Sequence, residues 1–130
     1  MLHVACAIII QNNKVLAVQR GANMKMAGKW EFPGGKLEQG ETPSQCIVRE
    51  ILEELSMTIQ VEEEWPSTIH QYNDFKIELI PLRCNSVQIS PILKEHQDFR
   101  WFDSESLFWV DWAEADIPIR DKVAKLLLSA

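Results

Sequence analysis

The chain is poor in cysteine, and its few cysteines follow no disulfide or metal-binding pattern. Cys6, Cys46 and Cys84 are odd in number and far apart, with no CxxC pair and no Cys/His cluster. This spacing argues against a zinc site and against a disulfide framework. We expect three buried free thiols in a protein of a reducing compartment, the cytoplasm.

Long hydrophobic runs are also missing. The most apolar stretch, residues 4–10, is too short to span a bilayer, and no basic segment or small-residue cleavage site accompanies it. Because it is apolar at every position, it is typical of a strand that is buried on both faces of a sheet. We therefore expect a central strand here and no membrane partner.

Positive charge is scarce as well: 13 lysines and arginines stand against 19 aspartates and glutamates, which gives a net charge of −6. A polymeric nucleic acid usually meets a basic surface, so such a partner is not expected. A single nucleotide is not excluded, because a bound metal ion can reverse the local field. With 130 residues and no repeat or linker, the chain is predicted to form one domain, residues 1–130.

The chain does contain a regular succession of strand-like and helix-like segments. Strands are predicted at residues 4–10, 15–20, 59–69, 75–84 and 99–102, with a short extended piece at 30–32. Pro81 predicts an edge position or a bulge for its strand. Strands that flank two main helices indicate an α/β layered domain with a mixed sheet.

The clearest helix follows Thr42. Thr42 suits the N-cap, Pro43 suits the first helical position, and Gln45 completes a capping box. The predicted apolar face of this helix comprises Ile47, Val48, Ile51, Leu52 and Leu55. A left-handed conformation at Ser56, after the helix, would cost on the order of 1–2 kcal/mol. A second amphipathic helix is predicted at 119–128, with Pro118 at its start.

Three carboxylates, those of Glu50, Glu53 and Glu54, gather on one side of the first helix. Glutamates at such spacing commonly form a solvated surface. They also repel one another and are tolerated best where a cation needs them, and Mg²⁺ prefers oxygen ligands together with substrate phosphate. The turn at Gly34 and Gly35, whose glycines permit backbone angles closed to other residues, can aim a carbonyl at the same ion.

The segment from Gly35 to Met57 resembles the signature of Nudix hydrolases, G-x5-E-x7-R-E-U-x-E-E-x-G-U, where U is a bulky aliphatic residue. The matching positions are Gly35, Glu41, Arg49, Glu50, Ile51, Glu53, Glu54 and Met57. Ser56 stands where the signature has glycine. Residues 30–36 and 40–43 further resemble the MutT branch of that family.

This resemblance implies a Nudix α/β/α sandwich, with a mixed sheet between helices. It implies hydrolysis of a nucleoside diphosphate linked to another moiety, with Mg²⁺ as cofactor and Mn²⁺ as its substitute. In the MutT branch a nucleoside triphosphate is cut to a monophosphate and pyrophosphate, by water that attacks the β-phosphorus.

The resemblance also implies roles for individual residues. Glu50, Glu53 and Glu54 would be metal ligands together with the Gly35 carbonyl, and Glu50 is a candidate base. Arg49 would orient these glutamates. Two further residues belong to the same region: Glu41 would brace the loop onto the helix, and Lys36 would lie near the phosphates.

Glu95 is a further candidate, since MutT-like proteins carry a functional glutamate, a metal ligand or a base, in a loop at this point. The alternative is a loop glutamate in water. His96, next to it, is expected to be a loop residue and not a catalyst, because the carboxylates already fill that role.

The nucleobase would be recognised by residues outside the signature. Arg20 and Phe32 lie where the MutT branch contacts the nucleotide, although a surface arginine and a core phenylalanine are the alternatives. Residues 115–121 are expected to form part of the base pocket. In that segment Asp116 would pair with a base amino group or belong to a helix N-cap, and Asp121 stands where oxidised-purine sanitisers have an asparagine.

The resulting hypothesis is a Mg²⁺-dependent nucleoside triphosphate pyrophosphohydrolase, with CTP, modified dCTP or oxidised dGTP as candidate substrates and nucleotide-pool sanitation, a form of DNA repair, as its role. Hydrolysis of a dinucleotide or a sugar nucleotide is one alternative. A nucleotide-sensing Nudix module without turnover and an acidic interaction domain are two others. The assembly is expected to be a monomer or a homodimer.

Overall fold

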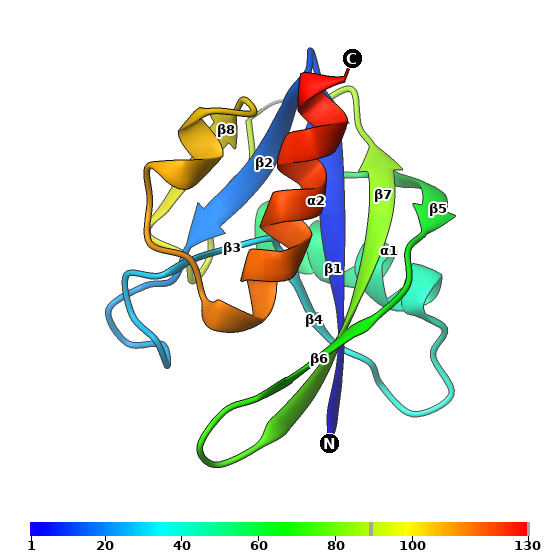
Figure 1. Ribbon diagram of the computed structural model, residues 1–130. Helices are drawn as coiled ribbons and strands as arrows, with labels where there is room; N and C mark the ends of the chain where they lie inside the picture. The colour runs from blue at the N-terminus through cyan, green and yellow to red at the C-terminus, as the bar shows by residue number, and fades with distance from the viewer. Residues whose placement is uncertain (89, 130) are drawn as a thin grey trace.

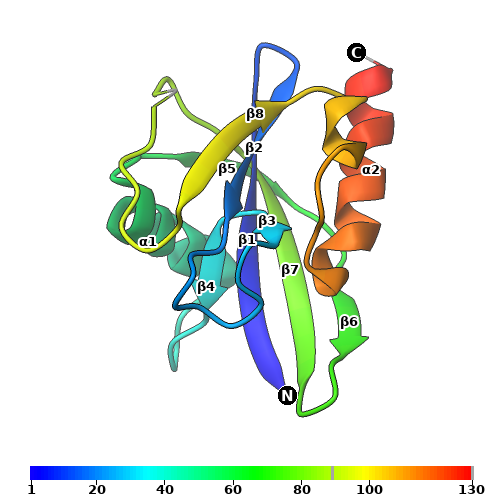
Figure 2. The ribbon, with the colours of Figure 1, turned by 90° about the vertical axis from the view of Figure 1, so that its left-hand side faces the viewer.

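The structure, a computed structural model, describes residues 1–88 and 90–129. Within this part of the chain a mixed eight-stranded sheet lies between two helices. Helix α1, Pro43–Leu55, covers one face, and helix α2, Ile117–Leu128, covers the other (Figures 1 and 2). The predicted α/β/α sandwich is confirmed.

The sheet is built around a parallel pair of long strands, and its other pairs are antiparallel. Strand β1 (Leu2–Gln11) runs parallel to β7 (Lys76–Asn85), and the main strand order is β3-β2-β1-β7-β5. In addition β4 pairs with β1, β6 with β7, and β8 with β2. The remaining strands are β2 (Lys14–Gln19), β3 (Trp30–Glu31), β4 (Gly34–Lys36), β5 (Gln60–Glu64), β6 (Thr68–Gln71) and β8 (Asp98–Phe102).

Strand β1 supplies side chains to the cores on both faces of the sheet. Ala5, Ala7 and Ile9 pack on the α1 side, whereas Cys6 and Ile8 pack on the α2 side. This alternation is the two-residue period of a strand, and it explains why residues 4–10 are apolar at every position. The three cysteines are buried and free, as predicted.

The long strand predicted at residues 59–69 is wrong, because two strands, β5 and β6, cover this region. Between them Trp65 is buried, and its backbone N–H donates to the carbonyl of Pro81 at 2.9 Å. Pro81 lies within β7, which is an interior strand and not an edge. A proline is accommodated there because it lies opposite the interruption between β5 and β6, and a bulge in β5 follows between Val61 and Glu63.

Helix α1 begins as predicted. The Thr42 hydroxyl accepts from Gln45 N at 3.1 Å, and the Gln45 side chain accepts from Thr42 N at 3.0 Å, which completes the capping box. Its buried face is narrower than predicted, since Val48 and Leu52 are 40% and 55% exposed. Each lies about 100° around the helix from its buried neighbour, on the flank away from the sheet.

Ser56 follows α1 in the left-handed conformation, with φ 52° and ψ 37°. Its backbone N–H donates to Leu52 O at 3.1 Å and so continues the helical hydrogen bonds by one residue. A serine in this conformation is strained where a glycine would not be. Helix α2 begins at Ile117, two residues before the predicted start, directly after a short 3-10 turn, η2 (Glu114–Asp116).

Candidate active site

The two glycines of β4 are required for space, and not for an unusual backbone. Neither Gly34 nor Gly35 has a positive φ, so the expectation of angles closed to other residues was wrong. A Cβ atom on Gly34 would lie 1.9 Å from the carbonyl oxygen of Ala5. A Cβ atom on Gly35 would lie 2.3 to 2.6 Å from the carboxyl atoms of Glu50. A side chain at position 35 would therefore displace the Glu50 carboxylate.

The thiol of Cys46 fills the seam between β4 and α1. Its Sγ atom lies 3.5 Å from the carbonyl oxygens of Gly35 and Lys36, and the side chain is fully buried. Burial, together with the charge of Glu41, raises the pKa of Cys46 to about 11. The thiol therefore stays neutral and packs as a small apolar group.

Arg49 is the centre of a carboxylate cluster. Its Nε and Nη2 atoms donate to the two oxygens of Glu41 at 2.7 and 2.9 Å, and Nη1 donates to Glu50 at 2.9 Å and to Glu53 at 3.3 Å. Glu41 also accepts from the backbone N–H of Glu38 at 2.9 Å. The Arg49 hydrogen bonds, followed by that of Glu38, lower the pKa of Glu41 to about 2. Arg49 and Glu41 thus tie the loop before α1 to the helix.

Two glutamates of α1, Glu50 and Glu54, have less favourable surroundings for their negative charge. Burial raises the pKa of Glu50, and the hydrogen bond from Arg49 opposes this shift. Burial also raises the pKa of Glu54, and the charge of Glu95 is the next cause. The Glu54 Oε2 atom is buried and has no hydrogen-bond partner among the described residues. These carboxylates would be stabilised by a cation, which would relieve both burial and mutual repulsion.

The side-chain conformations of the structure form no metal-binding group of three or more His, Cys, Asp or Glu residues within residues 1–88 and 90–129. Arg49 instead occupies the oxygens of Glu50 and Glu53. The chemistry of the donor set nevertheless suits a hard cation, because carboxylate oxygens crowd here and one of them, on Glu54, is unpaired.

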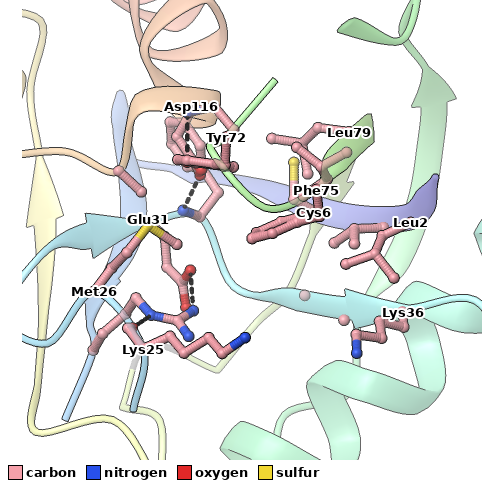
Figure 3. A pocket seen from close by; sticks show the side chains of 18 of the residues that line it. Leu2, Cys6, Lys25, Met26, Glu31, Lys36, Tyr72, Phe75, Leu79 and Asp116 are labelled. Carbon is pink, nitrogen blue, oxygen red and sulfur yellow. Dashed lines mark hydrogen bonds and ion pairs between the residues drawn. The ribbon is translucent and has the colours of Figure 1, made fainter. Parts of the chain in front are cut away.

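A cavity of about 570 Å³ adjoins this cluster. Figure 3 shows Lys36 on the side of the cavity next to α1, whereas Glu31 and Asp116 lie on the other side. The walls between these polar residues are mainly apolar and include Cys6, Phe32, Tyr72, Phe75, Ile77 and Leu79. Cavities that bind small ligands typically measure about 300–1,000 Å³ and combine apolar walls with a few polar groups.

Asp116 lies at the far side of the cavity and is buried, with 6% of its surface exposed. Its Oδ2 atom accepts from the backbone N–H of Phe32 at 2.9 Å (Figure 3). It occupies the N-cap position of α2, as the N-cap alternative expects, although its side chain makes no capping hydrogen bond. Burial, followed by the charge of Glu31, raises the pKa of Asp116 well above its ordinary range.

Phe32 is a core residue, with 3% of its surface exposed, and it also lines the cavity. Its ring lies 4.9 Å from that of Trp112, centroid to centroid. Arg20 is not a solvated surface arginine, because it lines the cavity and its Nη1 atom donates to Glu31 at 2.8 Å. The other Glu31 oxygen lies 2.8 Å from Nε2 of His96, which is buried.

Of residues 115–121, which are expected to form part of the base pocket, Ala115 and Asp116 line the cavity. Asp121 is exposed on α2, where it pairs with Arg120 at 2.8 Å. It lines a separate hollow together with Phe108. Asp121, predicted as a substrate-binding residue, is therefore placed outside the lining of this cavity, on the exposed side of α2.

Sequence reasoning missed Glu31 and His96, and also Tyr72 and Phe75 of the hairpin between β6 and β7. The Tyr72 hydroxyl accepts from the backbone N–H of Ala115 at 3.0 Å and so joins the hairpin to η2. Aromatic residues in a predicted turn were one available signal, and a glutamate in the otherwise apolar stretch 30–34 was another. The buried position of His96 left no signal in its local sequence.

Comparison with known proteins agrees with this geometry. The family model for the NUDIX domain matches residues 1–127 of the chain. The chain belongs to the Nudix family. It is 35% identical over 126 residues to an 8-oxo-dGTP diphosphatase of Escherichia coli (strain K12), covering 96% of this chain and 98% of that protein.

A CTP pyrophosphohydrolase of Escherichia coli (strain K12) is also 35% identical to this Nudix chain, over 119 residues that cover 92% of the chain and 88% of the relative. The solution structure of the E. coli ORF135 protein is similar in fold, with a TM-score of 0.80 at 34% identity. That similarity covers 100% of this chain and 91% of the other.

The chain is thus a Nudix hydrolase, an enzyme of a family that generally uses divalent metal ions. A search of the described residues finds no helix with the length and the apolar character that a bilayer span requires.

Proposed function

We propose that this Nudix hydrolase converts a nucleoside triphosphate and water into the monophosphate and pyrophosphate, with Mg²⁺ as its metal. One observation carries the proposal: Gly35 lines the cavity and also closely approaches the Glu50 carboxylate. A space of nucleoside size therefore adjoins the carboxylate cluster. Lys36, the next residue, is exposed at this boundary and is suited to phosphate.

The proposed metal ligands are the carboxylates of Glu50, Glu53, Glu54 and Glu95 with the carbonyl of Gly35. Bound Mg²⁺, or Mn²⁺ in its place, supplies charge neutralisation for the phosphates and polarises water. The unpaired Oε2 atom of Glu54 and the excess of carboxylates over cations support this assignment.

The remaining residues of the cluster act through their charges and hydrogen bonds. Glu50 is proposed as the general base, because its raised pKa brings its basicity closer to neutral pH. Arg49 is proposed to hold Glu50 in place, and the two-bond contact of Arg49 with Glu41 fixes the guanidinium itself.

Asp116 is proposed to read the nucleobase, with Phe32 and Arg20 as neighbouring contacts. The raised pKa of Asp116 favours a neutral carboxyl group, which offers one donor and one acceptor. A neutral carboxyl can pair with the amino donor and the N3 acceptor of cytosine, and also with N1–H and O6 of guanine, whereas an ionised carboxylate can pair only with the two donors of guanine. Because cytosine requires the neutral form, which burial favours, we rank CTP and modified dCTP as the first candidates and oxidised dGTP as the next. Removal of a modified deoxynucleotide would be nucleotide-pool sanitation.

The test is a panel of canonical, oxidised and methylated triphosphates, with detection of pyrophosphate and Mg²⁺ as the added metal. We expect pyrophosphate and monophosphate as products, with cytidine substrates turned over best. All residues named in the proposal lie between positions 20 and 116, so we expect the single predicted domain to carry the whole activity. Cleavage of dinucleotides or sugar nucleotides without turnover of any triphosphate would contradict the proposal. Tight nucleotide binding without turnover under any divalent metal would instead indicate a sensing module.

A further inference from the structure

Three polar side chains from distant parts of the chain meet at one side of the cavity. Arg20 follows β2, Glu31 belongs to β3, and His96 lies in the loop before β8. Each oxygen of Glu31 has its own partner at 2.8 Å, Arg20 Nη1 for one and His96 Nε2 for the other. The side chains are only 19%, 18% and 5% exposed for Arg20, Glu31 and His96. Such a buried, charge-assisted network fixes the relative positions of the segments that contribute to it.

The two ends of this network lie in different parts of the proposed site. At one end Arg20 and Glu31 line the cavity, and Figure 3 labels Glu31 there. At the other end His96 directly follows Glu95 in the chain, and the charge of Glu95 acts on Glu54 of α1. The network therefore extends from the proposed nucleobase cavity to the proposed metal ligands.

Backbone contacts anchor the loop of Glu95 on both sides. Ile92 N donates to Leu55 O, at the end of α1, at 2.9 Å, and Gln97 N donates to Gln19 O, at the end of β2, at 3.0 Å. A Cβ atom on Gly21 would lie 2.5 Å from the carbonyl oxygen of Glu95, so the segment that follows β2 is in close contact with this loop. Between these anchors the His96 ring is held through Nε2, while its buried Nδ1 has no partner among the described residues.

We propose that Glu31 is a positioning residue, which through His96 fixes the loop of Glu95 and through Arg20 fixes the wall of the nucleobase cavity. The inference rests on the proposed function, because it assumes that Glu95 is a metal ligand. Loss of the Glu31 carboxylate leaves Arg20 and His96 with unpaired buried groups, so the loop loses its side-chain anchor. Glu31 need not touch the metal or the reacting phosphates to affect both.

The experiment compares Glu31→Gln and His96→Phe with Glu95→Gln and with a matched control. The pair His3–Glu78 offers that control, because its atoms are 2.7 Å apart and it joins two strands, but it is exposed and takes no part in the network. Binding of Mn²⁺ to the full chain is followed by electron paramagnetic resonance without nucleotide. The kcat and KM values for triphosphates are measured over a range of Mg²⁺ concentrations.

We expect Glu31→Gln and His96→Phe to weaken Mn²⁺ binding by about 10-fold, the lower end of the range for residues that orient metal ligands. We expect Glu95→Gln to weaken it at least as much and Glu78→Gln to leave it unchanged. The double variant of Glu31 and His96 should lose no more than either single variant, because both changes release the same anchor. His96→Gln, which keeps a donor on its side chain, should recover part of the affinity.

An unchanged Mn²⁺ affinity in both Glu31→Gln and His96→Phe would overturn the proposal, as would a change in the KM for one nucleobase alone. That second pattern would mean that Glu31 contacts the substrate directly. If Glu31→Gln does not fold, His96→Phe decides, because it removes one hydrogen bond of the network and keeps a ring. Mn²⁺ binding is measured without substrate, so a failure of this inference is distinguishable from a failure to hydrolyse triphosphates.

Discussion

Two arginines organise carboxylates in this molecule, and they do so with opposite balances of charge. Arg49 is shared by Glu41, Glu50 and Glu53. Among the described residues Arg20 forms one ion pair, with Glu31, whose second oxygen contacts His96. Acidic groups outnumber the cation around Arg49, whereas each oxygen of Glu31 has one partner of its own. We therefore compare an excess of carboxylate, which we propose to bind a metal ion, with a balanced network, which we propose to set the geometry.

The largest loss of activity is expected when the excess negative charge of the Arg49 cluster is removed. Glu53→Gln combined with Glu54→Gln keeps the size of both side chains but removes two proposed metal ligands. We expect pyrophosphate release to fall by more than about 100-fold, because even groups that only orient metal ligands are worth about 10–100-fold. Circular dichroism should show an intact fold. Glu62→Gln combined with Glu63→Gln, on the exposed strand β5, is the matched control, and full turnover in the Glu53/Glu54 variant would refute the enzyme hypothesis.

Replacing Arg49 by lysine keeps the charge and breaks the geometry. Lysine cannot form the two parallel bonds that Arg49 forms with Glu41, so the loop before α1 should loosen. We expect kcat to fall by about 10–100-fold, the effect typical of groups that orient ligands. Unaltered kcat would mean that Arg49 is only a surface residue.

The same variant should also change stability in acid. In the wild type the pKa of Glu41 is lowered from 4.5 to about 2, so its stabilising contribution is present above pH 4.5 and is lost as the pH falls to about 2. In Arg49→Lys this loss should be smaller, because less of the lowering remains. Thermal unfolding followed over this acidic range measures the difference, with Lys29→Arg, at a separate exposed ion pair, as the control.

Asp116 lines the same cavity as Arg20 and Glu31, but its carboxyl group is not paired with a cation among the described residues. In the part of the chain that the structure describes, it accepts from the backbone of Phe32 and not from a cationic side chain. Since its pKa is raised, the neutral carboxyl predominates at lower pH and the ionised form gains as the pH rises. We expect the ratio of kcat/KM for cytidine over guanosine triphosphates to fall by about 10-fold across this titration, since a two-bond contact with a base is worth about 1–3 kcal/mol.

Asp116→Asn supplies the control for this pH dependence. The amide keeps one donor and one acceptor but does not titrate, so the ratio for cytidine over guanosine should stay constant with pH. A ratio that still falls with pH in Asp116→Asn would assign the titration to another group that lines the cavity.

The smallest effect is expected for Ser56→Gly, which changes the helix that carries the Arg49 cluster without touching the cluster. Glycine relieves a left-handed conformation that costs about 1–2 kcal/mol, but it loses about 0.5–1 kcal/mol through the flexibility of the unfolded chain. We expect a gain in the free energy of unfolding of up to about 1 kcal/mol, measured by urea denaturation. Activity should be unchanged, and a large loss of turnover would show that Ser56 has a chemical role.

The resemblance to the Nudix signature implied that Arg49 orients the glutamates, and the structure brings these residues together, since the partners of Arg49 lie one, four and eight residues away from it. Such short separations are fixed by helix geometry and by one loop. The capping box at Thr42 and the strain at Ser56 were predictable for the same reason. These features depend on local chain conformation, which the sequence reports directly.

The Arg20 network could not be predicted in this way, because Glu31 and His96 are 65 positions apart. Their contact depends on the pairing of β2 with both β3 and β8, which no local pattern encodes. Asp121 lies within the predicted helix and within α2, so its position outside the cavity depends on how α2 packs against the sheet, which no local pattern encodes. The edge position predicted for Pro81 was wrong because, on one side of β7, this residue faces the interruption between β5 and β6.

The buried thiol of Cys46 has one further consequence, for experiments on motion. It lies in the seam between β4 and α1, against the carbonyl oxygens of Gly35 and Lys36. An alkylating reagent can reach it only when that seam opens, so its rate of labelling in native protein reports the opening equilibrium at the proposed metal-binding face. If Mg²⁺ or a nucleotide slows the labelling of Cys46, the decrease in rate would measure closure of the site without any turnover.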